Sequence, residues 1–290
     1  MDDIEITIRR IADIKNCHSS QELLRQVWES NDLEILPTHA LITIAKNGGV
    51  ILGAYSPNGP LETNGMVGIV LGWPGLMLGE RGEPLVKHCS HQIGVLPAWR
   101  GNGVGLMLKL AQREAVLAQG VTELATWTYD PLRRANGVFN IHRLGATSDT
   151  YIRELYGEMD DALNVGLPTD RLQVDWKMRS ERVISALGVH RSPKTWLPAD
   201  MQLIPCLRSG NILRPGPVNL SFDGTPIAIP LPDSMETLRK REFEILIDWR
   251  LFLRTSFEQA FDASYKLVDC IELPQRGWHY ILTLNQPPGT

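Results

Sequence analysis

A cluster of three glycines constrains the fold of this chain more than any other short segment. In LPAWRGNGVGLMLK (residues 96–109), Gly101, Gly103 and Gly105 fall within five positions. The preceding segment, LVKHCSHQIGV (85–95), alternates like a strand, and apolar residues follow the glycines at helical spacing. The sequence therefore predicts a strand that enters a tight glycine turn and continues into a helix.

The predicted helix ends at Gly120 and has two unlike faces. The predicted apolar face comprises Val104, Met107, Leu108, Ala111, Ala115 and Ala118, and the predicted polar face comprises Lys109, Gln112, Arg113 and Gln119. At the helix N-terminus, backbone N–H groups lack intrahelical acceptors, and the helix dipole adds a partial positive charge. Such a turn is suited to binding a phosphate group.

Two other phosphate-binding motifs do not fit this turn. Counted from Gly101, Leu106 and Met107 stand where the P-loop needs glycine and lysine. The dinucleotide motif G-x-G-x-x-G needs a third glycine where Leu106 or Leu108 stands. The pattern that remains is R-x-x-G-x-G, from Arg100 to Gly105.

This pattern and its surroundings resemble the GCN5-related N-acetyltransferase (GNAT) superfamily, whose members bind acetyl-CoA at such a turn. Over about residues 85–190, SHQIGVLPAWRGNGVG, WTYDPLRRANGVFNIHRLGA and YGEMDDALNVGLPTDRLQVDW are similar to a bacterial group of large acyltransferases. That group includes succinyl-CoA:D-amino-acid N-succinyltransferases. The resemblance implies an α/β (α+β) GNAT fold, with a mixed, mostly antiparallel sheet flanked by helices and a smaller C-terminal α+β extension.

The resemblance also implies that acetyl-CoA or another acyl-CoA is the co-substrate. Backbone amides of the turn are expected to hold the pyrophosphate, and the strand end at Ile93 to Val95 is expected to pair with the pantetheine arm. The implied acyl-CoA contacts are Ile93, Gly94, Val95, Arg100, Gly101, Asn102, Gly103, Val104, Gly105, Leu106, Asn136 and Asn140. The alternative is a glycine-rich turn that holds no ligand.

The residue that many superfamily members use as a general acid is missing. That residue is a tyrosine four positions before the glycine that ends the second helix, but counting back from Gly145 gives Ile141. Tyr129, Tyr151 and Tyr156 lie in neighbouring segments without this spacing. A backbone N–H near Val95 is the expected oxyanion donor, since it needs no particular side chain.

His91 is the candidate general base. Strand alternation predicts that His91 shares a face with Ile93 and Val95, and imidazole titrates near neutral pH. The alternative is a histidine bonded within the sheet or half exposed. His88 is predicted to face the other way, so the two histidines are not expected to bind a metal.

Asp130 ends a predicted strand (123–130) and is the second catalytic candidate, as a group that binds the acceptor ammonium. Its alternative role is to cap the helix that begins near Leu132. The loop 156–171, long for a connection between two predicted paired strands, is expected to be a lid or a binding element. Its candidate substrate contacts are Tyr156, Asn164, Asp170 and Arg171. A surface excursion or a dimer contact is the alternative.

Other segments predict a mixed α and β order. Residues 4–11 alternate like a strand, a helix follows Ser19 and Ser20 as possible caps, and 48–55 and 65–73 read as an antiparallel hairpin. Two domains are predicted, an acyl-CoA-binding catalytic domain (1–190) and a C-terminal α+β extension (191–290).

In the extension, Asp233 and Glu236 are predicted to open a long helix that reaches about Phe261. Arg250 and Arg254 stand one turn apart in it. They could form a fork for a carboxylate, or they could be a solvated surface pair.

Composition excludes several classes of partner. The 290 residues carry a formal net charge of −4 without a long basic block, so nucleic acid is not expected to bind. The chain lacks an apolar run near the ~18 residues of a membrane span and opens unlike a signal peptide, so we expect a cytoplasmic protein without a membrane partner. Four scattered cysteines predict neither disulfides nor a zinc site, and no metal is expected.

The expected function is therefore an acyl-CoA-dependent N-acyltransferase acting on the amino group of a small molecule such as an amino acid. A non-catalytic acyl-CoA-binding or sensing protein is one alternative, because of the missing tyrosine. A protein lysine or N-terminal acetyltransferase is another, although an extra domain and a long loop favour an enclosed site. A homodimer is left open.

Overall fold

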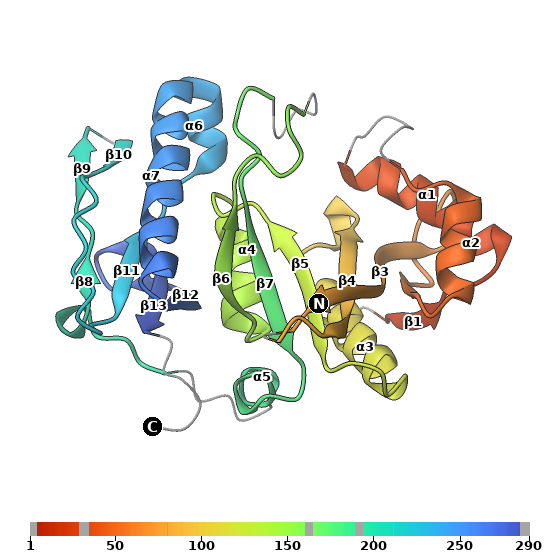
Figure 1. Ribbon diagram of the computed structural model, residues 1–290. Helices are drawn as coiled ribbons and strands as arrows, with labels where there is room; N and C mark the ends of the chain where they lie inside the picture. Colours follow the sequence, from red (N-terminus) through yellow and green to blue (C-terminus); the bar gives the residue numbers. More distant parts are fainter. Residues whose placement is uncertain are drawn as a thin grey trace. The chain divides into compact units, whose positions relative to one another are not determined.

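The computed structural model describes residues 5–28, 35–79, 81–159, 165–188, 194–210 and 212–284 (Figure 1). The chain forms two compact units, Met1–Trp127 and Thr128–Thr290. Each unit combines helices with strands, and nearly all the strand pairs are antiparallel, which confirms the predicted fold class. The predicted functional boundary near residue 190 stays a prediction.

The first unit is a mixed sheet with helices on both faces. Its elements are β1 (Thr7–Arg10), α1 (Ile14–Trp28), α2 (Thr38–Lys46), β2 (Val50–Tyr55), β3 (Met66–Leu78), β4 (Pro84–Val95), the 3-10 turn η2 (Pro97–Trp99), α3 (Val104–Ala118) and β5 (Leu124–Tyr129), which runs into the second unit. The strands lie in the order β1-β2-β3-β4-β5, and only β4 and β5 are parallel. The predicted strand, glycine turn and helix are confirmed, as is the 48–55 and 65–73 hairpin.

The two faces of this sheet are covered by different helices. Helices α1 and α2 pack on one face, where Leu23 and Leu41 join Ile69 in the main apolar core. Helix α3 covers the other face, and a Cβ placed on Gly68 of β3 would lie 3.1 Å from the side chain of Leu108. Gly68 therefore allows α3 to approach β3 closely.

The start of α1 differs from the prediction. The helix begins at Ile14, before Ser19 and Ser20, whose hydroxyls donate to backbone carbonyls one turn earlier. The N-terminal cap is Asp13, whose Oδ1 accepts the Asn16 N–H at 2.9 Å. The two serines are therefore helix-interior residues and not caps.

The second unit combines paired strands with a long helix. Its elements are α4 (Arg134–Gly137), the π-helix η3 (Val138–Arg143), β6 (Thr147–Ile152), β7 (Arg171–Lys177), α5 (Glu181–Leu187), η4 (Pro198–Asp200), β8 (Gln202–Leu203), β9 (Cys206–Ser209), β10 (Ile212–Pro215), β11 (Ile227–Pro230), α6 (Met235–Arg241), α7 (Phe243–Asp262), β12 (Tyr265–Leu273) and β13 (Gly277–Leu284). The strand order is β7-β6-β12-β13-β11-β8, and β9 and β10 form a separate hairpin.

The helix predicted to run from Asp233 to about Phe261 is two helices. Ser234, and not Asp233, caps α6, because its Oγ accepts the Thr237 N–H at 3.2 Å. The chain leaves helical geometry at Glu242, with φ −146° and ψ 60°, before α7 begins. No helix in the described part of the chain is long and apolar enough to span a membrane.

Candidate functional site

The glycine turn has a backbone that glycine adopts readily and other residues do not. Gly101 has φ +81° and Gly103 has φ +77°. A Cβ built on either glycine meets no atom within 4 Å. The left-handed backbone, and not crowding, therefore requires glycine at both positions, and the turn is open where a side chain would stand.

Backbone N–H groups are available where α3 begins. Gly103 is the N-cap residue, and no side chain caps the helix there. The Met107 N–H donates to the Gly103 carbonyl at 3.0 Å, so the N–H groups of Val104, Gly105 and Leu106 come before the first intrahelical bond. Together with the helix dipole they form a site suited to an anion.

Strand β4 has an unpaired edge close in sequence to this turn. Among the described residues, β4 pairs with β5 only at His88 with Ala125 and at Cys89 with Thr126. On the other edge, the Leu96 N–H donates to the carbonyl of Val67 in β3 at 3.0 Å. Alternation then turns the backbone groups of Ile93 and Val95 away from β3.

Arg100 and Asn102 are exposed residues of the turn. The Arg100 Nε donates to the Val95 carbonyl at 3.0 Å, and Asn102 Nδ2 lies 3.5 Å from the Arg100 carbonyl. Arg100 therefore joins the turn to the open edge of β4.

A β-bulge in β4 separates His91 from the residues expected to share its face. Leu71 of β3 pairs with Gln92 and Gly72 pairs with Ser90, so His91 is the extra residue. An extra residue reverses the alternation beyond it, which puts Ile93 and Val95 on the side of α3. The expectation that His91 shares their face is wrong for this reason.

His91 itself lies on the α1 and α2 side of the sheet. Its ring centroid is 4.9 Å from that of Trp73, which packs against the core beneath those helices. The surroundings of the imidazole ring partly desolvate it and lower the pKa of His91, while part of the side chain stays exposed to solvent. His88 faces α3, as the prediction of opposite faces requires, and burial followed by repulsion from Lys109 lowers its pKa to about 4.

Two residues predicted on the polar face of α3 are buried. Lys109 is 2% exposed and Gln112 is 1% exposed, whereas Met107, predicted on the apolar face, is 38% exposed. Val104 and Leu108 of the predicted apolar face are buried as predicted. The prediction was wrong for Lys109 and Gln112, because β4 offers polar partners to these two side chains. A sheet that supplies such partners can bury polar side chains of a helix.

These buried side chains form one network between α3, β4 and β5. Lys109 Nζ donates to Gln112 Oε1 at 2.7 Å and to Ser90 Oγ at 3.1 Å. The same nitrogen lies 3.7 Å from the centroid of the Trp127 ring. Gln112 Nε2 is 3.2 Å from His88 Nε2. Burial lowers the pKa of Lys109 from 10.5 to about 7.

Asp130, in the second unit, is buried and bonded to its neighbours. Its Oδ1 accepts the Leu132 N–H at 2.9 Å and lies 2.8 Å from Nη2 of the fully buried Arg250. Asp130 therefore binds the segment before α4 and does not cap that helix, because α4 begins at Arg134, its N-cap residue is Arg133 and no side chain caps it. Its Oδ2 has no hydrogen-bond partner among the described residues.

Asp170 has no capacity left for a substrate. Its Oδ1 accepts from Arg254 Nη2 at 2.8 Å and from the Glu154 N–H at 3.1 Å, and its Oδ2 accepts from Arg254 Nε and the Tyr151 hydroxyl, each at 2.8 Å. These bonds fill about four acceptor positions of a carboxylate. The predicted substrate role of Asp170 is corrected to a structural one, and Arg250 and Arg254 are not a solvated surface pair.

Tyr156 and Arg171 come together at the two ends of the predicted loop. The Arg171 guanidinium lies 5.2 Å from the centroid of the Tyr156 ring, and Tyr156 is half exposed. The ends are joined further by the Leu155 N–H, which donates to the Thr169 carbonyl. Asn164 lies outside the described residues.

The second helix of the predicted motif is a short α-helix that continues as a π-helix. Asn136 is half-buried in α4, and Asn140 is buried in η3. The helix ends before Gly145, which has φ +71°, as predicted. Ile141 is buried, and the Tyr151 hydroxyl is bonded to Asp170.

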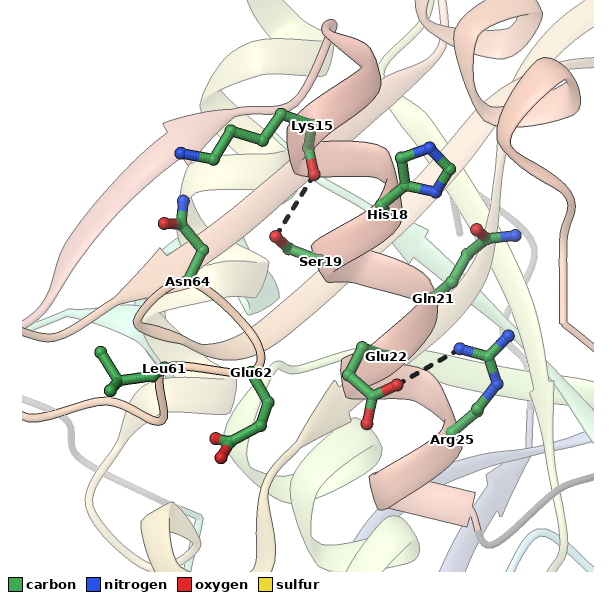
Figure 2. A pocket seen from close by; sticks show the side chains of 9 residues that line it. All are labelled: Lys15, His18, Ser19, Gln21, Glu22, Arg25, Leu61, Glu62 and Asn64. Atoms are coloured by element: carbon green, nitrogen blue, oxygen red, sulfur yellow. Dashed lines mark hydrogen bonds and ion pairs between the residues drawn. The ribbon is translucent and has the colours of Figure 1, made fainter.

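An open pocket of about 690 Å³ lies elsewhere in the first unit (Figure 2). Six of its residues come from α1 and three from the segment between β2 and β3: Lys15, His18, Ser19, Gln21, Glu22, Arg25, Leu61, Glu62 and Asn64. Its lining mixes both signs of charge, and it includes none of the predicted site residues. Within the described ranges, no three His, Cys, Asp or Glu side chains are grouped to hold a metal ion.

Comparison with known proteins found similarity at the level of structure. No protein-family model matches the chain, and no curated protein matches it. The chain is similar to Arabidopsis thaliana NAA60 in complex with acetyl-CoA (TM-score 0.46, 12% identity, covering 59% of this chain and 98% of that one). It is also similar to a GNAT-family acetyltransferase from Streptococcus pneumoniae, with a TM-score of 0.42 and 16% identity. A third similar structure is the IAA acetyltransferase from Bacillus cereus, with a TM-score of 0.40 and 13% identity. Each of these two matches covers 59% of this chain and 98% of the other.

Proposed function

We propose that this chain is an acyl-CoA-dependent N-acyltransferase that transfers an acetyl or succinyl-type group to the amino group of a small molecule such as an amino acid. One observation carries the proposal. The open glycine turn at the start of α3 follows a strand whose edge is unpaired beyond Cys89 among the described residues. A coenzyme with a pyrophosphate and an extended amide-bearing arm matches these two features.

The turn and the strand edge have separate roles in binding. The N–H groups of Val104, Gly105 and Leu106 bind the pyrophosphate, with Gly101, Asn102 and Gly103 shaping the turn. The backbone groups of Ile93 and Val95 pair with the amides of the pantetheine arm, as in strand addition.

Acyl transfer needs the acceptor amine in its neutral form. The amine nitrogen attacks the thioester carbonyl, the C–S bond then breaks, and the proton lost by the amine goes to a base while CoA leaves as a thiolate and takes up a proton. His91 is the proposed base, because partial burial lowers its pKa and so favours the neutral imidazole, which can accept a proton. A backbone N–H near Val95 is the proposed donor to the oxyanion.

Asp130, Tyr156 and Arg171 are the proposed contacts of the acceptor amine. The buried Oδ2 of Asp130 supports this role, because it has no hydrogen-bond partner in the described part of the chain and can accept a bond from an ammonium group. Asn136 and Asn140 are proposed contacts of the pantetheine arm, on the resemblance alone.

The glycine turn is tested by Gly103→Val with Gly120→Val as its matched control. Both glycines have positive φ, and a Cβ on either meets nothing within 4 Å, but Gly120 follows the opposite end of α3. Calorimetric titration with acetyl-CoA should show a loss of affinity of ~100-fold or more for Gly103→Val, since a branched side chain would stand where the pyrophosphate approaches the turn. Gly120→Val should bind like the wild type. Equal affinities in all three proteins would exclude this turn as the binding site.

A non-catalytic acyl-CoA sensor is the second candidate, because Ile141 stands where a general acid is common. Acetyl-, succinyl- and other acyl-CoAs should be tested against a panel of D- and L-amino acids, with release of the CoA thiol as the readout. Release that depends on an added amine supports an enzyme. Tight binding with no release for any amine supports a sensor.

His91→Ala tests the proposed base. The substitution should slow the chemical step by roughly 10²–10⁴-fold with little change in acyl-CoA affinity. The loss should shrink as pH rises, because more of the acceptor amine is then already neutral. Turnover like that of the wild type at pH 7 would show that His91 is structural.

A further inference from the structure

The backbone pairing of β4 and β5 ends early. Its last pair joins Cys89 to Thr126. The residues that follow on the face covered by α3 are Ser90 in β4 and Trp127 in β5, as their contacts with Lys109 show. Beyond that pair, side chains must set the separation of the two strands, since no backbone bond between them is described there.

Lys109 connects the two strands at this point. Its Nζ donates to Ser90 Oγ at 3.1 Å and lies 3.7 Å from the centroid of the Trp127 ring, within the range of a cation–π contact. A single side chain of α3 therefore contacts both strands at the first position where they separate.

Gln112 fixes the geometry of this connection. Its Oε1 accepts from Lys109 Nζ at 2.7 Å and from Ser90 Oγ at 3.0 Å, and its Nε2 is 3.2 Å from His88. His88, Ser90, Lys109 and Gln112 are each at most 6% exposed. Hydrogen bonds in such a dry setting are stronger than in water, so the network holds Ser90 in place.

The position of Ser90 affects the strand edge that follows it. Ser90 directly precedes the bulge residue His91, and the bulge determines which way the backbone groups of Ile93 and Val95 point. We propose that Lys109 is a positioning residue, which, by holding Ser90 and Trp127, sets the opening between β4 and β5 and the edge that receives the pantetheine arm. This inference rests on the proposed function.

Stability provides an independent argument. Keeping an amine buried costs free energy, which is why burial lowers the pKa of Lys109 so far. A methionine of similar length would fill the same space without this cost. A residue that served only to pack α3 on the sheet would therefore be better apolar, whereas a connection between two strands needs the polar end group.

The test compares Lys109→Met and Ser90→Ala with the control Lys46→Met, which removes an exposed lysine from the last turn of α2. Three quantities are measured: the melting temperature, amide hydrogen exchange in the peptide covering residues 88–96 without ligand, and acetyl-CoA binding with KM and kcat. Lys109→Met should keep or raise the melting temperature. It should speed exchange in 88–96 and weaken acetyl-CoA binding by ~10-fold or more, since small misplacements of binding groups have effects of this size.

The effect should appear in KM for acyl-CoA more than in kcat, and Ser90→Ala should change both readouts in the same direction. Exchange and affinity like those of the wild type in Lys109→Met would overturn the inference. If that variant does not fold, Ser90→Ala decides by the same criteria. If the wild type binds no acyl-CoA, the proposed function fails, and exchange in 88–96 alone then decides whether Lys109 positions this edge.

Discussion

Cationic side chains that are buried or partly buried have different partners in the two units. In the second unit, Arg254 makes two bonds of 2.8 Å to Asp170, and Arg250 lies 2.8 Å from Asp130. In the first unit, the groups that Lys109 contacts in the network are neutral: a hydroxyl, an amide oxygen and an aromatic ring. Only the arginines are held by carboxylates in these contacts.

The pKa values follow this difference. Burial raises the pKa of Asp170, but hydrogen bonds from Arg254, the Glu154 N–H and Tyr151 outweigh it, so the net shift is downward. The same pairing raises the pKa of Arg254, whereas burial lowers that of Lys109 to about 7. The pair in the second unit stays charged at neutral pH, and Lys109 changes charge there. The charges of Arg254 and Asp170 are therefore constant near neutral pH, whereas the charge of Lys109 depends on the pH.

The largest effect is expected from Asp170→Asn. The substitution leaves Arg254 and the other donors without a carboxylate, so the free energy of unfolding should fall by about 3–5 kcal/mol. Urea denaturation at pH 7 measures this change. A loss below ~1 kcal/mol would mean that the pair is as weak as an exposed one.

Lys109→Met should change stability in the opposite direction. At pH 6 the free energy of unfolding should rise by about 1–4 kcal/mol, as when other buried charged groups are replaced by apolar ones. Because folding lowers the pKa of Lys109, the unfolded chain binds more protons between about pH 7 and 10.5, and wild-type stability rises with pH across that window. The advantage of Lys109→Met should therefore be largest below pH 7 and shrink by pH 9.5 in denaturation series. A difference that does not vary with pH would show that the lysine is not titrating in the folded state.

The charge of Lys109 should have a smaller effect on the pKa of His88. Burial is the larger cause of its low pKa, about 4, and the Lys109 ammonium is the second. In Lys109→Met the pKa of His88 should rise but stay below 6.5, because the burial remains. The pKa of His88 in the wild type and in Lys109→Met is measured by NMR titration of the imidazole signals. An unchanged pKa would show that Lys109 is uncharged near His88 in the wild type.

The smallest effect is expected from Asp233→Asn. Asp233 Oδ2 lies 3.4 Å from Arg208 Nη2, and both side chains are more than half exposed. Surface pairs contribute about 0–1 kcal/mol, so urea denaturation should show a change within that range. A loss as large as that of Asp170→Asn would remove the distinction between buried and exposed pairs in this unit.

Local patterns predicted the framework of the first unit well. Alternation located β4, the glycines located the turn and the end of α3, and the runs 48–55 and 65–73 located the hairpin of β2 and β3. Helix α2 was missed, since its run of Ile42, Thr43 and Ile44 is rich in β-branched residues.

Features that depend on a distant partner could not be predicted in this way. The bulge at His91 depends on its register with Leu71 and Gly72 of β3, which alternation within β4 does not encode. Arg254 looks like a surface residue until Asp170, distant in sequence, is placed beside it. A signal for the buried network did exist, because His88 and Ser90 share one strand face while Lys109 and Gln112, three residues apart, share one helix face.

The bulge has a consequence for how chains of this kind can change over generations. A deletion of His91 would remove the bulge, but Gly72 would still pair with Ser90 and Leu71 with Gln92, so Ile93 and Val95 would keep their face and their open edge. The loss or gain of the bulge therefore absorbs a change of one residue in length. Lineages can differ by one residue at this place while the strand edge beyond it stays the same.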